Sequence, residues 1–193
     1  MTGIYGGSFN PIHEGHLQLG EWLCKEGHLD ELWFLVSPLN PLKKDIGATL
    51  LDDKTRLHLA ELAVLGHPQL QASGFEMTLP LPSYMVHTLE ALRREYPEKE
   101  FALVIGADNW LCFHQWKDPD EILRHHRVFI YPRNGYAIDM KALPEGVVYL
   151  QDAPLYDISS TIIRNAIASG GYNGEWLTPA VWQEIQKESL YTR

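Results

Sequence analysis

The stretch GGSFNPIHEGH, from Gly6 to His16, decides the fold. A short apolar run, residues 3–5, precedes it, and an amphipathic segment, residues 17–24, follows it. This order predicts a strand, a glycine-rich turn and the first turn of a helix. Helix N-termini present unpaired N–H groups and the positive end of the helix dipole to an anion. Since glycines let a phosphate approach the main chain, we expect an anion cradle at Gly6, Gly7, Ser8 and Phe9.

Two histidines, three residues apart, close this stretch. On a first helical turn His13 and His16 face the same side, where imidazoles can donate hydrogen bonds to charge developing on a phosphoryl group. A zinc protease needs histidines four apart, and His28, His58 and His87 are candidate third ligands by type only. The remaining alternative is a pair of capping or surface histidines.

Two common phosphate-binding motifs are absent from the sequence, the Walker A loop and the dinucleotide fingerprint G-x-G-x-x-G. Phosphate binding therefore depends on the glycine-rich loop and on a second element near the C-terminus.

The second phosphate element is Ile158–Arg164, ISSTIIR, in which hydroxyl side chains stand where a helix begins. Ser159 or Ser160 suits the N-cap. Arg164 in the first turn opposes the helix dipole unless an anion lies beside it, and a guanidinium suits bidentate phosphate binding.

Composition indicates an enzyme-like globular protein. The 193 residues are 45% hydrophobic and 21% charged, which is ordinary for one folded domain. A net charge of −9 argues against a nucleic-acid partner, although local cations can still bind small phosphorylated ligands. No signal peptide or membrane-length apolar run is evident, so we expect no membrane association. Cys24 and Cys112 stand in unrelated segments, which favours a reducing, cytoplasmic environment.

Strand-like and helix-like segments alternate along the chain. We expect strands near 4–5, 32–36, 70–75, 101–105, 128–131 and 147–150, and helices near 15–26, 52–65, 83–96, 118–126, 159–169 and 178–187. This alternation predicts an α/β protein with a Rossmann-like, doubly wound parallel sheet. We expect one domain, residues 1–193, with a small C-terminal helical part at about 158–193. Ligands of such a fold bind at the carboxyl ends of the strands.

The two phosphate elements resemble the H-x-G-H and I-S-S-T-x-x-R signatures of the nucleotidyltransferase superfamily. From Gly6 to Arg164 the chain resembles bacterial nicotinate-mononucleotide adenylyltransferases. The resemblance implies transfer of an adenylyl group from ATP to nicotinate mononucleotide, with Mg²⁺ arriving on ATP, and it implies that His16, His13 and Arg164 are catalytic. The implied ATP contacts are Gly6, Gly7, Ser8, Phe9, His13, His16, Lys44, Gly106, Asp108, Ser159, Ser160, Thr161 and Arg164.

Three further stretches resemble the part of the family that binds the acceptor. Residues 82–88, PSYMVHT, are similar to P-S-Y-T-x-x-T, with Met85 in place of a threonine. Residues 105–116 are similar to I-G-x-D-x-L-x-x-F-x-x-W. Residues 131–136 are similar to the R-P-G-Y turn, with Asn134 in place of proline. The implied acceptor contacts are Tyr84, Thr88, Asp108, Trp116 and Arg133. Trp116 would stack on the pyridine ring and Asp108 would bind a ribose hydroxyl. Arg133 would lie near the acceptor phosphate or carboxylate, while Trp110 and Phe113 are expected in the core.

Two departures from the family pattern fall on the ATP side. Lys43 stands where histidine is usual, so Lys44 is the safer counterpart for the triphosphate contact. Asn10 stands where many relatives have aspartate, which removes one negative charge near the phosphates.

Other functions remain open at this stage. A phosphopantetheine adenylyltransferase would share both phosphate signatures, although such chains are usually shorter and lack the Asp108-to-Trp116 pattern. A cytidylyltransferase ranks third. A catalytically silent nucleotide sensor should have lost His13, His16 or Arg164, and a fragment of a class I aminoacyl-tRNA synthetase does not fit the acidic charge. The sequence leaves open whether the acid or the amide form of the mononucleotide is preferred, and it is compatible with a homo-oligomer.

Overall fold

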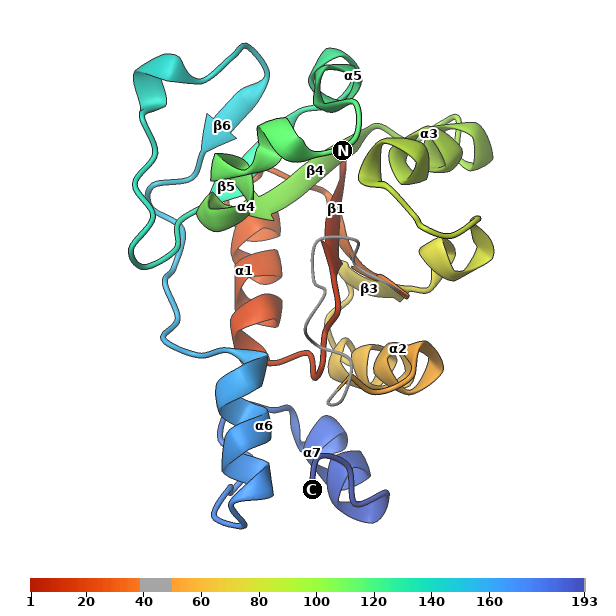
Figure 1. The fold of residues 1–193 in the computed structure, drawn as a ribbon, viewed down its shortest axis with the longest axis vertical. Helices are drawn as coiled ribbons and strands as arrows, with labels where there is room; N and C mark the ends of the chain where they lie inside the picture. The colour runs from red at the N-terminus through yellow and green to blue at the C-terminus, as the bar shows by residue number, and fades with distance from the viewer. Residues whose placement is uncertain (39–49, 193) are drawn as a thin grey trace.

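Six parallel strands form the centre of the protein, in a computed structural model that describes residues 1–38 and 50–192 (Figure 1). Their order across the sheet is β3-β2-β1-β4-β5-β6, and every neighbouring pair is parallel. The strands are β1 (Thr2–Gly7), β2 (Glu31–Val36), β3 (Leu70–Ser73), β4 (Phe101–Gly106), β5 (Val128–Tyr131) and β6 (Val147–Tyr149). The chain winds outward from β1 to one edge and then returns to β4, so the winding direction reverses between β1 and β4. Ligands of open α/β sheets bind at such a reversal.

Helices cover both faces of the sheet, as the doubly wound prediction requires. They are α1 (Glu14–Lys25), α2 (Asp53–Ala63), α3 (Met85–Glu95), α4 (Ala107–Leu111), α5 (Pro119–His125), α6 (Ser160–Ala168) and α7 (Pro179–Lys187), with 3-10 turns at Phe75–Thr78, Phe113–Gln115 and Met140–Ala142. Residues of α1, α2, α6 and α7 pack in one hydrophobic cluster with one face of the sheet. Residues of α3 and α5 pack in a second cluster with the other face.

The predicted elements are confirmed within a few residues at their ends. The predicted caps also form: Asp52 accepts a hydrogen bond from the Thr55 N–H at the start of α2, and Ser159 accepts one from the Ile162 N–H at the start of α6. The short helix α4 was not predicted, because five residues directly after β4 are too few to show a helical period.

The C-terminal helices belong to the same core as the sheet. Ile163 of α6 and Val181 of α7 are fully or almost fully buried in the cluster that includes Leu17 of α1 and Phe34 of β2. The α6 and α7 segment therefore folds onto the sheet domain, at the end where β1 stops (Figure 1). Within residues 1–38 and 50–192, no helix has the length and apolar character needed to span a bilayer.

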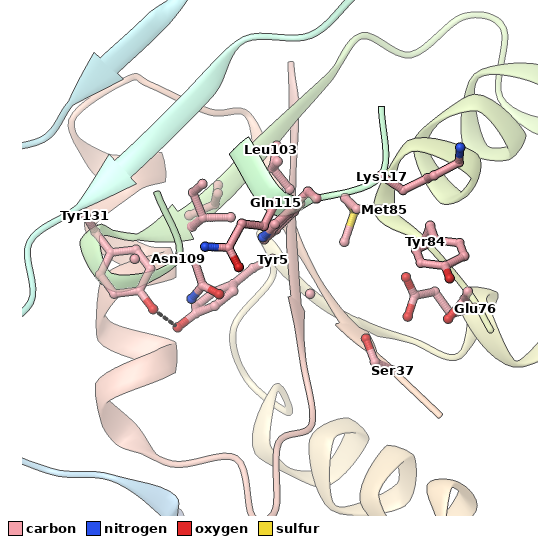
Figure 2. Close-up of a pocket in the computed structure, with 16 residues that line it drawn as sticks. Tyr5, Ser37, Glu76, Tyr84, Met85, Leu103, Asn109, Gln115, Lys117 and Tyr131 are labelled. Atoms are coloured by element: carbon pink, nitrogen blue, oxygen red, sulfur yellow. Dashed lines mark hydrogen bonds between the residues drawn. The ribbon is translucent and has the colours of Figure 1, made fainter. Parts of the chain in front are cut away.

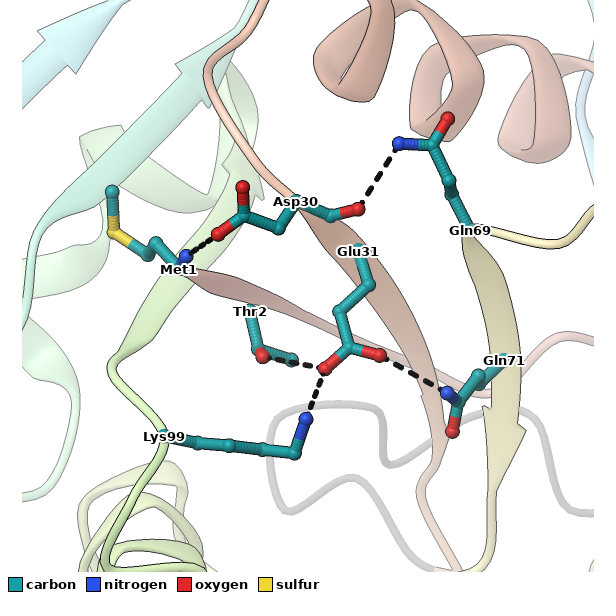
Figure 3. A network of polar contacts seen from close by, with 7 residues as sticks. All are labelled: Met1, Thr2, Asp30, Glu31, Gln69, Gln71 and Lys99. Carbon is teal, nitrogen blue, oxygen red and sulfur yellow. Dashed lines mark hydrogen bonds and ion pairs between the residues drawn. The ribbon is translucent and has the colours of Figure 1, made fainter.

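Polar contacts close the amino end of the sheet (Figure 3). The Glu31 carboxylate at the start of β2 accepts hydrogen bonds from the Thr2 hydroxyl at 2.8 Å and from the Gln71 amide at 3.0 Å, and it pairs with Lys99. These contacts join β1, β2, β3 and the segment that leads into β4. The cavities described below open at the opposite, carboxyl end.

A buried arginine ties together the loops at the carboxyl end. Arg56 of α2 is 1% exposed, and its guanidinium donates to four main-chain carbonyls. The acceptors are Leu51 at 2.9 Å, Ser8 at 2.7 Å, Ser37 at 2.9 Å and Pro38 at 3.4 Å. One side chain therefore fixes the loop after β1, the end of β2 and the entry to α2.

We expect replacement of this arginine to destabilise the fold. Arg56→Met fills a similar volume but leaves four carbonyls without their donor, which should cost at least about 3 kcal/mol of unfolding free energy. For a domain of this size that corresponds to a fall of roughly 6–12 °C in Tm. Thermal unfolding followed by circular dichroism measures it.

The matched control is Arg94→Met, since Arg94 forms an exposed pair with Glu90 on α3 and should contribute less than about 1 kcal/mol. Equal stability of Arg56→Met and the unmodified protein would show that the four contacts do not hold the loops.

Candidate active site

Three adjoining cavities open where the winding of the sheet reverses. Tyr5 of β1 and Tyr131 of β5 line all three, so the cavities meet at these two side chains. We call them the tryptophan pocket, which includes Trp116, the histidine cavity, which includes His13 and Arg164, and the outer cavity, which extends from His13 to Ile162. The sequence-based prediction of a ligand site at the carboxyl ends of the strands is consistent with this arrangement.

The histidine pair lies at the start of α1. His13 has extended backbone angles at the N-cap position, and His16 lies in the first turn. Their rings stack with centroids 3.7 Å apart and planes inclined by 31°. The His13 N–H donates to His16 Nδ1 at 3.2 Å, so this nitrogen is an acceptor and the proton of a neutral His16 ring resides on Nε2.

Burial keeps the His13 ring neutral. The side chain is 7% exposed, and desolvation, followed by the nearby positive charge of Arg133, lowers the pKa of His13 to about 3. Its Nδ1 is buried and lacks a hydrogen-bond partner among the described residues.

The loop before the histidines follows a path that its glycines permit. Phe9 adopts left-handed backbone angles, φ 44°, and its ring lies over Gly7, where a Cβ atom would come within 2.9 Å of the ring. Gly6, Gly7, Ser8 and Phe9 line the histidine cavity, as the sequence predicted for an anion cradle.

The second phosphate element lies directly against the first. Ser160 Oγ at the start of α6 donates to the Pro11 carbonyl at 2.8 Å, and Arg164 Nη1 donates to the Asn10 carbonyl at 2.8 Å. Arg164 Nη2 also bonds Thr161 Oγ1 at 3.2 Å. Residues separated by about 150 positions are thereby brought together, and Ser159, Ser160, Thr161 and Arg164 all line the histidine cavity.

A chain of polar groups separates the histidine cavity from the tryptophan pocket. The hydroxyls of Tyr5 and Tyr131 are 2.7 Å apart, and Arg133 Nη2 donates to the Tyr131 hydroxyl at 2.9 Å (Figure 2 shows the tyrosine pair). Arg133 Nε faces Asp108 Oδ1 at 3.7 Å, beyond hydrogen-bond distance. The two groups form an ion pair, and neither atom has a hydrogen-bond partner in the described part of the chain. Asp108 and Arg133 line the histidine and outer cavities rather than the tryptophan pocket.

The tryptophan pocket is aromatic on one side and polar on the other. Trp116 packs on Phe113 with ring centroids 5.2 Å apart, and Phe113 in turn stacks on Trp110 at 5.1 Å. Phe113 is 4% exposed, which confirms its expected place in the core, whereas Trp110 is half-buried and packs against that core. Tyr84 and Met85, at the start of α3, also line the pocket, and Tyr84 lies near Glu76 (Figure 2). Gly6 and Gly106 complete the floor at the strand ends.

Glycine at position 106 has a steric reason. A Cβ atom there would come within 2.3 Å of Asp108 Oδ1 and 3.1 Å of the Tyr131 ring, so a side chain would displace both. The absence of a side chain at Gly106 therefore leaves room for the Asp108 carboxylate and the Tyr131 ring at the end of β4.

Thr88 does not reach the pocket. Its side chain is fully buried, and its hydroxyl donates to Glu76 Oε1 at 2.9 Å and lies 3.3 Å from the Tyr84 carbonyl. Glu76 is itself 3% exposed and does line the pocket. Thr88 therefore supports the wall rather than forming its surface.

Several lining residues were missed from the sequence. Glu76, Ser37, Asn109 and Gln115 all line the tryptophan pocket, and Asn109 also lines the histidine cavity. Asn109 could have been found, since it follows Asp108 within a recognised motif. Lys44 and its neighbour Lys43 lie outside the described residues, so the predicted triphosphate contact stays a prediction. In residues 1–38 and 50–192, no group of three or more His, Cys, Asp or Glu side chains could hold a metal ion.

The sequence model of the cytidylyltransferase-like family matches residues 4–166. The chain belongs to this family. A probable nicotinate-nucleotide adenylyltransferase of Bacteroides fragilis is 46% identical over 188 residues, which are 97% of this chain and 92% of that protein. Its counterpart in Bacteroides thetaiotaomicron is 47% identical over 186 residues, 96% and 91% of the two chains. The resemblance to nicotinate-mononucleotide adenylyltransferases is thereby confirmed.

A solved structure confirms the fold of this family member. The nicotinic acid mononucleotide adenylyltransferase of Plasmodium falciparum, complexed with NaAD, superimposes with a TM-score of 0.77. The comparison covers 99% of this chain and 97% of that one, at 18% sequence identity.

The low pKa of His13 predicts a pH dependence of stability. In the unfolded chain an ordinary histidine takes up a proton below about pH 6.5, whereas folded His13 does so near pH 3. The neutral buried ring therefore contributes full stability above the unfolded pKa, and that contribution falls as the pH is lowered between these values. Between pH 5.5 and 4, we expect the unfolding free energy of His13→Gln to fall less steeply than that of the unmodified protein, by about 1.4 kcal/mol per pH unit.

Urea unfolding at a series of pH values measures the two slopes. Parallel slopes for His13→Gln and the unmodified protein would contradict the neutral, buried state of His13. His126, whose pKa burial also lowers, is present in both proteins and does not affect the comparison.

Proposed function

We propose that this protein transfers the adenylyl group of ATP to nicotinate mononucleotide, giving deamido-NAD and pyrophosphate, a step of NAD biosynthesis. The observation that supports it most strongly is the placement of both phosphate elements between two cavities that could each hold a nucleoside. The tryptophan pocket offers an aromatic surface to a pyridine ring. The outer cavity offers Pro132, Pro154 and Ile162 to an adenine base. Relatives of nearly equal length carry the same activity in their names.

The chemistry needs position and charge stabilisation rather than a covalent intermediate. An oxygen of the acceptor 5′-phosphate attacks the α-phosphorus of ATP in line, a new P–O bond forms, and the bond from the α-phosphorus to the bridging oxygen breaks. Both electrons of that bond leave with pyrophosphate. Phosphate is already a competent nucleophile, so no protein base is required.

We assign the central contacts to the histidine cavity. His16 Nε2–H would donate to the α-phosphate, whose negative charge grows in the transition state. Neutral His13 would bind the triphosphate beside it, and the N-terminus of α1 would add its dipole. Arg164, with Lys44, would neutralise the leaving pyrophosphate. The backbone of Gly6–Phe9 and the hydroxyls of Ser159, Ser160 and Thr161 would complete the ATP site.

The acceptor would extend from the tryptophan pocket toward Asp108. Trp116 would stack on the nicotinate ring, Tyr84 would line the same pocket, and the ribose would lie near Gly106. Asp108 would accept a hydrogen bond from a ribose hydroxyl. Arg133 lines the histidine cavity and not the tryptophan pocket, which favours a contact with the acceptor phosphate over one with the distant carboxylate. Thr88 would act through Glu76.

Magnesium would arrive bound to ATP. Phosphate and water oxygens supply most ligands of Mg²⁺ in nucleotide sites, so a carboxylate cage is not required. Asp108 is the one carboxylate that lines the histidine cavity in the described part of the chain, and it would face such an ion. When bound, the ion would reduce the charge on the triphosphate.

A pyrophosphate-release assay with three acceptors tests the proposal. We expect Mg²⁺-dependent release from ATP with nicotinate mononucleotide, accompanied by deamido-NAD, and much slower release with phosphopantetheine. His16→Ala should lower kcat by about 100- to 1000-fold, the usual loss when one transition-state donor is removed. Nicotinamide mononucleotide, the third acceptor, reports the preference between acid and amide.

The matched control is His58→Ala, because His58 lies on the outer surface of α2 near Glu61 and Glu184, away from the cavities. Near-normal turnover of a folded His16→Ala protein would contradict the role of His16. Pyrophosphate release only with phosphopantetheine would support the assigned phosphate site but contradict nicotinate mononucleotide as the acceptor. Binding of ATP without turnover of any acceptor would favour a catalytically silent nucleotide sensor.

A further inference from the structure

The end of the chain folds back onto the loop that precedes the histidines. Past α7, Ser189 and Tyr191 both have left-handed backbone angles, φ 51° and 63°. Non-glycine residues adopt this conformation at a cost, so surrounding contacts must hold it. A local hydrogen bond, from the Leu190 N–H to the Ile185 carbonyl at 3.0 Å, provides part of this restraint on the backbone. The conformation directs Tyr191 toward Asn10.

Tyr191 meets a buried side chain of the phosphate site. Its hydroxyl donates to Asn10 Oδ1 at 2.8 Å, and the Leu51 N–H donates to the same oxygen at 3.3 Å. Asn10 is 3% exposed and lines the histidine cavity. Its main-chain carbonyl accepts the 2.8 Å hydrogen bond from Arg164. The tail is therefore two hydrogen bonds from the guanidinium assigned to the pyrophosphate.

The electrostatic surroundings fit a fixed hydroxyl donor. Burial raises the pKa of the Tyr191 phenol well above its ordinary value, although the positive charges of Arg164 and Arg56 oppose this. The hydroxyl therefore keeps its proton at any pH where the protein works. An amide oxygen accepts and never donates, so the direction of the bond to Asn10 is settled.

We propose that Tyr191 is a positioning residue for ATP: its hydroxyl, through Asn10, holds the carbonyl that orients Arg164. The inference rests on the proposed function to the extent that Arg164 contacts the phosphates of ATP. It assigns Tyr191 a role in the phosphate site, beyond covering the core with an aromatic ring.

Tyr191→Phe tests this, because it removes the hydroxyl and keeps the ring that packs against the core. Loss of one such hydrogen bond should raise the KM and the Kd for ATP by about three- to tenfold and leave the KM for the acceptor unchanged. In an Asn10→Ala background, which lacks the accepting oxygen, Tyr191→Phe should have no further effect on ATP. A residue that merely stabilises the fold would not show this dependence on Asn10.

Thr178→Ala is the matched control. It removes the N-cap of α7, which costs about 1 kcal/mol of stability in the same C-terminal part without touching Asn10. We expect a lower Tm and an unchanged KM for ATP. An unchanged ATP affinity in Tyr191→Phe, or an equal loss in both backgrounds, would overturn the proposal.

Direct titration calorimetry with ATP separates this inference from the proposed reaction. Weaker ATP binding by Tyr191→Phe supports the role of Tyr191 even if no acceptor is turned over. Absence of ATP binding to the unmodified protein would overturn both.

Discussion

The buried guanidinium of Arg56 is the contact on which the site depends, because it joins the entry to α2 to the loops that follow β1 and β2. It donates hydrogen bonds to main-chain carbonyls of all three segments. A buried charge is costly unless it is fully hydrogen-bonded, and here four carbonyls perform that task. With these loops fixed, the main chain of Ser8 and Asn10 has a rigid base on which an anion cradle can be built.

The fold then explains how an acidic protein can hold a polyphosphate. Its net charge is −9, yet Arg164, Arg133, the N-terminus of α1 and the N-terminus of α6 converge on one cavity. They converge because the winding reverses between β1 and β4, and because α6 of the C-terminal part lies at the carboxyl end of β1 (Figure 1). Fixed dipoles and a few cations can focus positive potential locally whatever the total charge.

Much of this could be predicted from local sequence. The strands and long helices follow their hydrophobic periods, and the histidine pair and Arg164 carry recognisable chemistry over short spans. Contacts between distant segments could not be predicted, because the tertiary fold determines them. The burial of Thr88 beneath Glu76 and the approach of Tyr191 to Asn10, 181 positions away, are of this kind. The placement of Arg133 beside His13 likewise became evident only once β1 and β5 flanked the same cavity.

In the proposed function, the tryptophan pocket and the outer cavity hold the two halves of one dinucleotide, and its phosphates lie between them in the histidine cavity. A crystal structure of the protein with deamido-NAD tests it most directly. We expect the nicotinate ring on Trp116, the adenine beside Pro132 in the outer cavity, and the bridging phosphates within hydrogen-bond distance of His16. An adenine in the tryptophan pocket, or phosphates remote from His16, would contradict it.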